Sequence, residues 1–173
     1  MQDKYFVLDE VHVLEIQLTT DQIESLKEFL PKVQREHKEV YKNSGVPKFE
    51  KVYEMERQLY NTVESLFPTG VDFLSIEHNG VLNNHLANEL HIDFDKAMRK
   101  SGNYWTIVWY FSDNTDSPLI IVDEVGKHLR IDPKCGKVVA FPSSTFHGVP
   151  VCAANDWRSS IVAIVKIKHN KAR

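Results

Sequence analysis

Short stretches in which apolar and polar residues alternate dominate the chain from residue 71 onward. Such alternation is typical of half-buried strands, and turn-forming residues separate the stretches. Eight strands are expected from this pattern: 71–78, 89–94, 104–112, 117–123, 128–132, 137–141, 147–151 and 158–168. A succession of short strands with turns between them indicates an antiparallel sandwich or barrel.

The first 70 residues show mainly helical periodicity. Residues 5–18 are expected to form one or two strands. Thr19 and Gln22 resemble a capping box at the start of a helix that Pro31 ends or kinks, and a second helical stripe continues through Val33, His37, Val40 and Tyr41. Apolar residues between 49 and 67 predict a further amphipathic helix, which ends at Pro68-Thr69-Gly70.

Helices that precede a run of antiparallel strands fit a fold in which the helices pack on one face of a two-sheet jelly roll. We therefore expect an α+β, mainly β fold, a double-stranded β-helix with an N-terminal helix layer on one sheet. At 173 residues the chain suits a single domain over 1–173. Within it, 1–70 would supply a strand and supporting helices, and 71–168 the jelly-roll core.

Composition excludes several classes of protein. A net charge of −3 gives no strong attraction to nucleic acid or to an anionic membrane. The two cysteines, Cys135 and Cys152, form no Cys-x-x-Cys motif and are expected to be buried free thiols. No secretory signal or transmembrane run is visible, so a cytoplasmic location is expected.

Three residues carry the strongest chemical signal. His91 and Asp93 lie two positions apart in an alternating segment, so a strand would place both on one face. His147 follows later, and Arg158 comes 11 residues after it. Two histidines and one carboxylate are a ligand set that holds iron on one face and leaves the other open. An arginine offers a planar, permanently charged partner for a carboxylate.

The strand around Thr106 and Tyr110 also carries polar residues on one face. These two side chains are four positions apart and share that face with Tyr104 and Val108. Trp105, Ile107, Trp109 and Phe111 occupy the opposite face. Polar groups facing the interior need partners once they are buried.

Four segments in order resemble one known family. They are His91-Ile92-Asp93, the strand from Thr106 to Ser112, the run from Pro133 to Ser143, and the stretch from His147 to Ser160. They are similar, respectively, to the first metal motif, the Thr-x-x-x-Tyr-Leu-Asn strand, the Pro-x-x-Gly-x-x-x-x-Phe-x-Ser run and the distal histidine with the cosubstrate arginine. The chain thus resembles the Fe(II)/2-oxoglutarate-dependent oxygenases, particularly their prolyl-hydroxylase-like branch.

The resemblance implies that His91, Asp93 and His147 bind Fe(II), and that Arg158, Tyr110, Thr106 and Ser160 contact the cosubstrate 2-oxoglutarate. With O2, such an enzyme couples decarboxylation of 2-oxoglutarate to hydroxylation of an unactivated C–H bond. The leading substrate is a peptide or protein side chain such as proline, and the alternative is a free amino acid or small metabolite. No nucleic acid or membrane partner is expected, and the protein would be a monomer or homodimer.

Departures from the family pattern leave other readings open. Phe111-Ser112 replaces the Leu-Asn ending of the family strand, which places the prolyl specificity in question. Asp93 argues against related halogenases, which lack this carboxylate. Ile164 stands where the nucleic-acid-dealkylating branch carries a second arginine. A metal enzyme of the cupin type, independent of 2-oxoglutarate, or a non-catalytic jelly roll that acts as a binding module would need no role for Arg158 or Tyr110.

Overall fold

The computed structural model describes residues 10–22, 24, 40–42, 50–82, 88–93, 103–113, 118–123, 125–150 and 157–168. Its elements in chain order are β1 (His12–Glu15), β2 (Val40–Lys42), α2 (Glu50–Leu66), β3 (Val71–Leu82), β4 (Asn88–His91), β5 (Tyr104–Tyr110), β6 (Leu119–Val122), β7 (His128–Ile131), β8 (Lys137–Pro142), β9 (Phe146–Val149) and β10 (Trp157–Ile167). Each of the eight strands expected from residue 71 onward is present, with ends that differ by a few residues.

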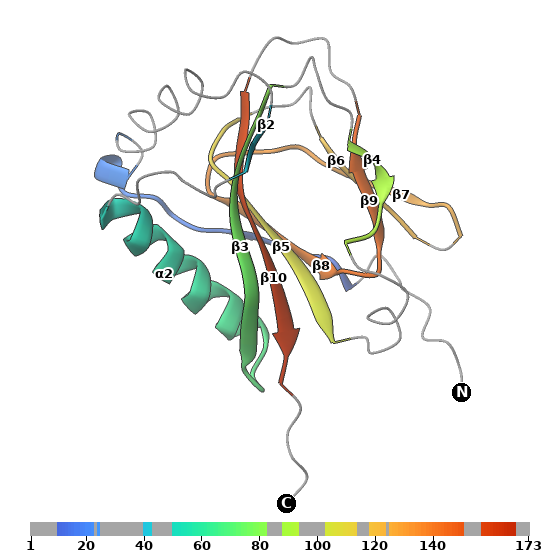
Figure 1. Ribbon diagram of the computed structural model, residues 1–173, viewed down its shortest axis with the longest axis horizontal. Coiled ribbons are helices and arrows are strands. Elements are labelled where there is room, and N and C mark those ends of the chain that lie inside the picture. The colour runs from blue at the N-terminus through green and yellow to red at the C-terminus, as the bar shows by residue number, and fades with distance from the viewer. Residues whose placement is uncertain are drawn as a thin grey trace, which may run out of the picture.

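Two antiparallel sheets form the body of the molecule (Figure 1). The larger sheet has the order β1-β8-β5-β10-β3-β2, and the smaller has the order β4-β9-β6-β7. Apart from the consecutive pairs β2-β3 and β6-β7, neighbouring strands are distant along the chain, as in a jelly roll. The expected fold, a mainly β jelly roll with a helix on one sheet, is confirmed.

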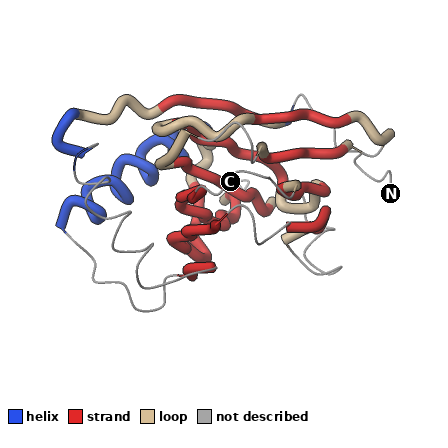
Figure 2. The backbone as a smooth tube through the Cα atoms, turned by 90° about the horizontal axis from the view of Figure 1, so that it is seen from above, coloured by secondary structure: helices blue, strands red, loops and turns tan. Residues whose placement is uncertain are grey.

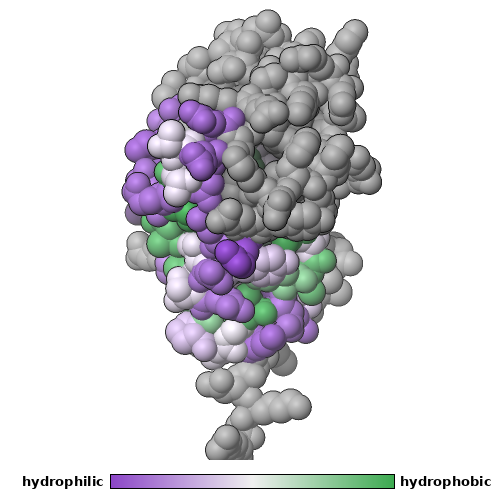
Figure 3. All heavy atoms as spheres, turned by 90° about the vertical axis from the view of Figure 1, so that its left-hand side faces the viewer, coloured by the Kyte–Doolittle hydropathy of each residue, from purple (hydrophilic) through white to green (hydrophobic). Residues whose placement is uncertain are grey.

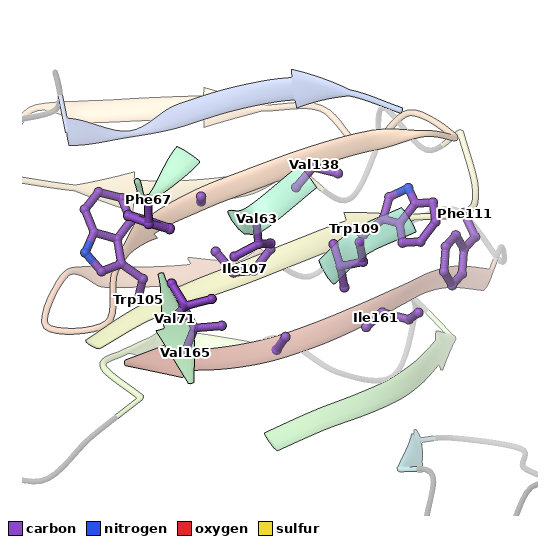
Figure 4. Packing of buried hydrophobic residues seen from close by; sticks show 13 residues of the cluster. Val63, Phe67, Val71, Trp105, Ile107, Trp109, Phe111, Val138, Ile161 and Val165 are labelled. Atoms are coloured by element: carbon purple, nitrogen blue, oxygen red, sulfur yellow. The ribbon is translucent and has the colours of Figure 1, made fainter. Parts of the chain in front are cut away.

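The helix α2 packs on the outer face of the larger sheet, on the side away from the smaller sheet (Figures 1 and 2). Leu59 and Val63 in α2 and Phe67 directly after it recur every fourth residue and are buried. Figure 4 shows this layer, in which they meet side chains of β5, β8 and β10 and of Phe111 directly after β5: Trp105, Ile107, Trp109, Phe111, Val138, Ala140, Ile161, Ala163 and Val165. The amphipathic helix predicted from the sequence is confirmed.

The inner face of the larger sheet looks toward the smaller sheet. A second apolar cluster fills this space and consists of Val108, Tyr110, Leu119, Ile121, Ile131, Val139 and Phe141. Successive side chains of β5 therefore pack into the two clusters on opposite faces of the sheet, as the sequence pattern predicts. This alternation directs Thr106 and Tyr110 into the interior between the sheets.

The capping box at the start of the first helix is also confirmed. The backbone N–H of Thr19 donates to Gln22 Oε1 at 2.8 Å, and the N–H of Gln22 donates to Thr19 Oγ1 at 3.3 Å. Residues 20–22 and 24 are helical. The reciprocal bonds satisfy backbone donors that a helix start otherwise leaves unpaired.

Three expectations about element boundaries are wrong. Val40 and Tyr41 belong to a strand and not to a helix, because they pair with β3, where Tyr41 lies opposite Gly80. The strand β3 continues to Leu82, beyond its expected end at residue 78. The strand β4 ends at His91, and Asp93 lies in a bend beyond it. The expectations for residues 5–9, His37 and Cys152 fall outside the described residues.

The side of the molecule that carries α2 presents a largely hydrophilic described surface (Figure 3). Among the described residues, no helix combines the length and the apolarity needed to cross a lipid bilayer.

Candidate metal centre

The two predicted ligand histidines face each other across a pair of strands. In the smaller sheet, His91 of β4 lies opposite His147 of β9, and their ring centroids are 4.4 Å apart. His147 is buried, lies opposite Ile121 of β6 and contacts the ring of Phe141 at 4.8 Å between centroids. The register of β4 on β9 thus brings together residues that are 56 positions apart in the sequence.

Asp93 reaches the same point from the bend after β4. Its backbone N–H donates to the Ser143 carbonyl at 3.4 Å, which ties this bend to the turn between β8 and β9. Its Oδ1 atom lies 3.4 Å from Nε2 of His91 and 3.4 Å from Nε2 of His147. One ligand atom from each of the three residues lies within 4.8 Å of the others.

These distances suit a divalent transition metal. Ligands at adjacent corners around an ion with bonds of about 2.1 Å are about 3.0–3.4 Å apart, whether the geometry is octahedral or tetrahedral. Two imidazole nitrogens and one carboxylate oxygen fill three such positions and leave the remaining positions open. The residues therefore fit a metal with exchangeable sites.

The ring of His147 is held by a second contact. Its Nδ1 atom lies 3.0 Å from the carbonyl oxygen of Thr145, to which only a protonated nitrogen can donate. With the proton on Nδ1, Nε2 is free to offer its lone pair to a metal ion; without a metal, it donates to Asp93 when it also carries a proton. Metal-binding histidines commonly donate their other ring nitrogen in this way.

The carboxyl group of Asp93 is kept ionised. Burial raises its pKa, but the hydrogen bonds from His147 and His91, the charge interaction with His147 and the hydrogen bond from Thr106 outweigh burial. Together they hold the pKa of Asp93 well below its usual range. The site therefore carries a negative charge for a cation at neutral pH.

Thr106 is placed differently from the other expected cosubstrate contacts. Its buried hydroxyl donates to Asp93 Oδ2 at 2.6 Å and lies 2.9 Å from the hydroxyl oxygen of Ser143. The only proton of the Thr106 hydroxyl is thus engaged with Asp93.

Tyr110 and Ser160 lie opposite each other on β5 and β10, and both are buried. Arg158 comes two residues before Ser160 in β10, opposite Val81 of β3. Its side chain lies outside the part of the chain that the structure describes. The register brings the strand positions of Tyr110, Ser160 and Arg158 to one region, and their role at a cosubstrate stays a prediction.

Two contributors were not predicted as site residues. Ser143 stands at the end of the Phe-x-Ser run, so the sequence contained a signal for it. Thr145 contributes a backbone carbonyl, for which no residue type gives a signal. Both lie in the short turn 143–145 between β8 and β9.

The three ligands differ in their exposure to solvent. The side chain of His91 is 41% exposed, that of Asp93 19% and that of His147 8%. The candidate centre is thus closed to solvent at His147 and more exposed at His91.

Comparison with sequences found no matching family model and no matching curated protein. Solved structures match well. A Trichoplax adhaerens prolyl hydroxylase in complex with a hypoxia inducible factor oxygen degradation domain peptide fragment gives a TM-score of 0.70 at 12% identity, over 92% of this chain and 84% of that chain. An oxidoreductase of the 2OG-Fe(II) oxygenase family from Burkholderia pseudomallei gives 0.66 at 11% identity, over 93% and 86%. The chain has the fold of the 2OG-Fe(II) oxygenases.

A third structure with this oxygenase fold is HygX from Streptomyces hygroscopicus with nickel, 2-oxoglutarate and hygromycin B bound. It gives a TM-score of 0.66 at 13% identity, over 91% of this chain and 82% of that chain. The resemblance drawn from four sequence segments is confirmed at the level of the fold.

Proposed function

We propose that this protein is a non-haem Fe(II) dioxygenase that uses 2-oxoglutarate and O2 to hydroxylate an unactivated C–H bond of its substrate. The observation that carries the proposal is the convergence of His91, Asp93 and His147, with Asp93 Oδ1 at 3.4 Å from both histidine nitrogens. An iron ion bound there would activate O2, the oxidant, while 2-oxoglutarate would supply two electrons through its decarboxylation to succinate.

The protein's own residues bind and orient the reactants. Asp93 supplies the charge that compensates the cation, and the two histidines supply neutral nitrogen ligands. Phe141 and Ile121 lie beside His147 and exclude water from the closed side of the centre. A bound cosubstrate would then meet an apolar wall in which few polar groups fix its orientation.

The proposed contacts to the distal carboxylate of 2-oxoglutarate are Arg158, Tyr110 and Ser160. Tyr110 and Ser160 are buried polar residues on paired strands, 1% and 5% exposed. Strand alternation assigns Arg158 to the same face of β10 as Ser160. A guanidinium and two hydroxyls match a carboxylate, because all of them can donate hydrogen bonds to it.

The test is an anaerobic titration of the metal-free protein, first with Fe(II) and then with 2-oxoglutarate. A visible charge-transfer band that requires both additions is expected. Arg158→Ala should weaken the band at a fixed 2-oxoglutarate concentration. Arg130→Ala is the matched control, because Arg130 is 58% exposed and forms a surface ion pair with Asp132.

Each outcome decides between the readings. A band in the wild type that Arg158→Ala weakens and Arg130→Ala retains supports an oxygenase that uses 2-oxoglutarate. Metal binding without a band, or a band equally strong in Arg158→Ala, contradicts the proposed cosubstrate site. Metal binding without a band favours a metal enzyme of the cupin type. A wild-type protein that binds no metal favours a non-catalytic binding module.

The substrate we propose is a peptide or protein side chain such as proline. Two observations support it: the similarity to the prolyl hydroxylase that was solved with a peptide, and the exposure of the centre on the His91 side, which admits a large substrate. Prolyl peptides should stimulate succinate formation from 2-oxoglutarate, and a hydroxylated peptide should appear by mass spectrometry.

A small metabolite is the second candidate, because HygX has a comparable fold and was solved with hygromycin B bound. Free amino acids and small hydroxylated compounds belong in the same succinate assay. Stimulation by these compounds, with no response to prolyl peptides, would overturn the peptide assignment and leave the oxygenase chemistry intact.

A further inference from the structure

The two carboxylate oxygens of Asp93 have separate partners. Oδ1 lies between the Nε2 atoms of His91 and His147, at 3.4 Å from each. Oδ2 accepts a hydrogen bond of 2.6 Å from the hydroxyl of Thr106, a residue of β5 in the larger sheet. Since the histidines belong to the smaller sheet, Asp93 bridges the two sheets through its side chain.

The direction of the hydrogen bonds follows from proton counting. An ionised carboxylate can only accept, so the single proton of the Thr106 hydroxyl goes to Asp93. The bond of 2.9 Å between Thr106 and Ser143 must then be donated by Ser143. The result is a chain of donors from Ser143 to Thr106 to Asp93, whose first two members are each 1% exposed.

The outer end of this chain is anchored in the backbone. The N–H of Ser143 donates to the Tyr104 carbonyl at 2.9 Å, and the Ser143 carbonyl accepts from the N–H of Asp93 at 3.4 Å. Ser143 thus contacts Asp93 directly through its carbonyl and indirectly through the Thr106 hydroxyl. Both the backbone N–H and Oδ2 of Asp93 are therefore held by hydrogen bonds.

We propose that Thr106 and Ser143 are positioning residues that hold Asp93 Oδ2, so that Oδ1 alone is presented to the metal. The proposal rests on the proposed function in one respect, that the three-residue centre binds a divalent metal. In this proposal Thr106 orients the metal ligand Asp93. The sequence had instead predicted that Thr106 contacts the cosubstrate. Partners that orient metal ligands typically contribute about 10- to 100-fold to metal affinity.

The experiment measures the affinity for Ni(II) alone by calorimetry, with no 2-oxoglutarate and no turnover. Thr106→Val keeps the shape of the side chain and removes its hydroxyl, and should weaken Ni(II) binding by about 10- to 100-fold. Thr106→Ser is the matched control, because it retains the hydroxyl and should bind within a few-fold of the wild type. Ser143→Ala leaves Thr106 in place and should give a smaller loss.

The double variant Thr106→Val with Ser143→Ala tests the chain as a unit. Because the Ser143 hydroxyl acts through Thr106, its removal should add little once the Thr106 hydroxyl is gone. The visible spectrum of the Co(II) complex gives a second readout. A carboxylate free to bind through both oxygens changes the coordination, so the Thr106→Val spectrum should differ from that of the wild type.

The outcomes separate this inference from the proposed function. If Thr106→Val binds Ni(II) as tightly as the wild type but binds 2-oxoglutarate more weakly, the inference is overturned. Thr106 would then be a cosubstrate contact, as the sequence predicted. Equal losses in Thr106→Ser and Thr106→Val would also overturn it, since the hydroxyl would then be irrelevant. A wild-type protein that binds no divalent metal would contradict both the inference and the proposed function.

Discussion

At the scale of single residues, His147 is held from both sides of its ring. Nδ1 contacts a backbone carbonyl and Nε2 faces Asp93 Oδ1, so the ring cannot turn without losing one of the two contacts. Close packing on Phe141 adds a steric restraint. A ligand that is already oriented loses little conformational freedom on binding, and this favours affinity.

Cys135 shows how local charge controls a residue outside the centre. It is half-buried and free, and burial together with the nearby Asp113 carboxylate raises the pKa of its thiol. Asp113 also accepts the backbone N–H of Cys135 at 2.7 Å. The thiol is therefore expected to be largely protonated and unreactive at neutral pH.

Replacing Asp113 with Asn tests this. The amide oxygen still accepts the backbone bond, but the charge is lost, so the pKa of the thiol falls. Iodoacetamide at pH 8 should then alkylate Cys135 roughly a few-fold faster, measured by mass spectrometry in a Cys152→Ser background. An unchanged rate would show that burial alone determines the reactivity, and a slower rate would contradict the effect assigned to the Asp113 charge.

At the scale of elements, the turn before β8 depends on a glycine. Gly136 has a φ of 90°, and a Cβ atom added there would lie 2.6 Å from the carbonyl oxygen of Ile16. Its N–H donates to the Tyr110 carbonyl at 2.9 Å, and its own carbonyl accepts from the Ile16 N–H at 2.8 Å. This turn thus joins the end of β5 to the segment after β1.

Gly136→Ala should therefore destabilise the protein more than Gly126→Ala. Gly126 has a φ of 80° but no atom within 4 Å of an added Cβ, so its variant incurs only the strain of the left-handed conformation. That strain is about 1–2 kcal/mol, and the clash at Gly136 should add about 1–3 kcal/mol. Urea unfolding of both variants measures the difference, and equal midpoints would contradict the assignment.

Local patterns predicted the strands and α2 because burial on one face leaves a period in the sequence. The β5 alternation is the clearest example, with Trp109 and Tyr110 in opposite cores. The strand β2 was not predicted, because Val40 and Tyr41 also fit a helical stripe. Only the long-range pairing of Tyr41 with Gly80 decides between strand and helix.

The candidate centre was predictable to a similar degree. His91, Asp93 and His147 were identified because metal chemistry restricts the residue types. The contact between Thr106 and Asp93 was not identified, because it depends on where β4 ends and how Asp93 turns back beyond it. Three-dimensional distances, and not sequence spacing, show which side chain the Thr106 hydroxyl contacts.

At the scale of the whole molecule, metal binding should raise thermal stability, because the ligands converge only in the folded chain. A site at 100 times its dissociation constant adds about 2.7 kcal/mol, which is about 5–10 °C in Tm for a chain of this size. Differential scanning calorimetry of the untagged protein with Ni(II) measures the shift, and EDTA should reverse it. The same shift in His147→Ala would mean that Ni(II) binds elsewhere.

The turn 143–145 has a further consequence. Those three residues carry the chain from the larger sheet to the smaller one and support Asp93, Thr106 and His147. The sheets cannot separate at this corner without breaking the supports of two metal ligands at once. A molecule that begins to open there should therefore lose its affinity for a metal at this centre before the two sheets come apart.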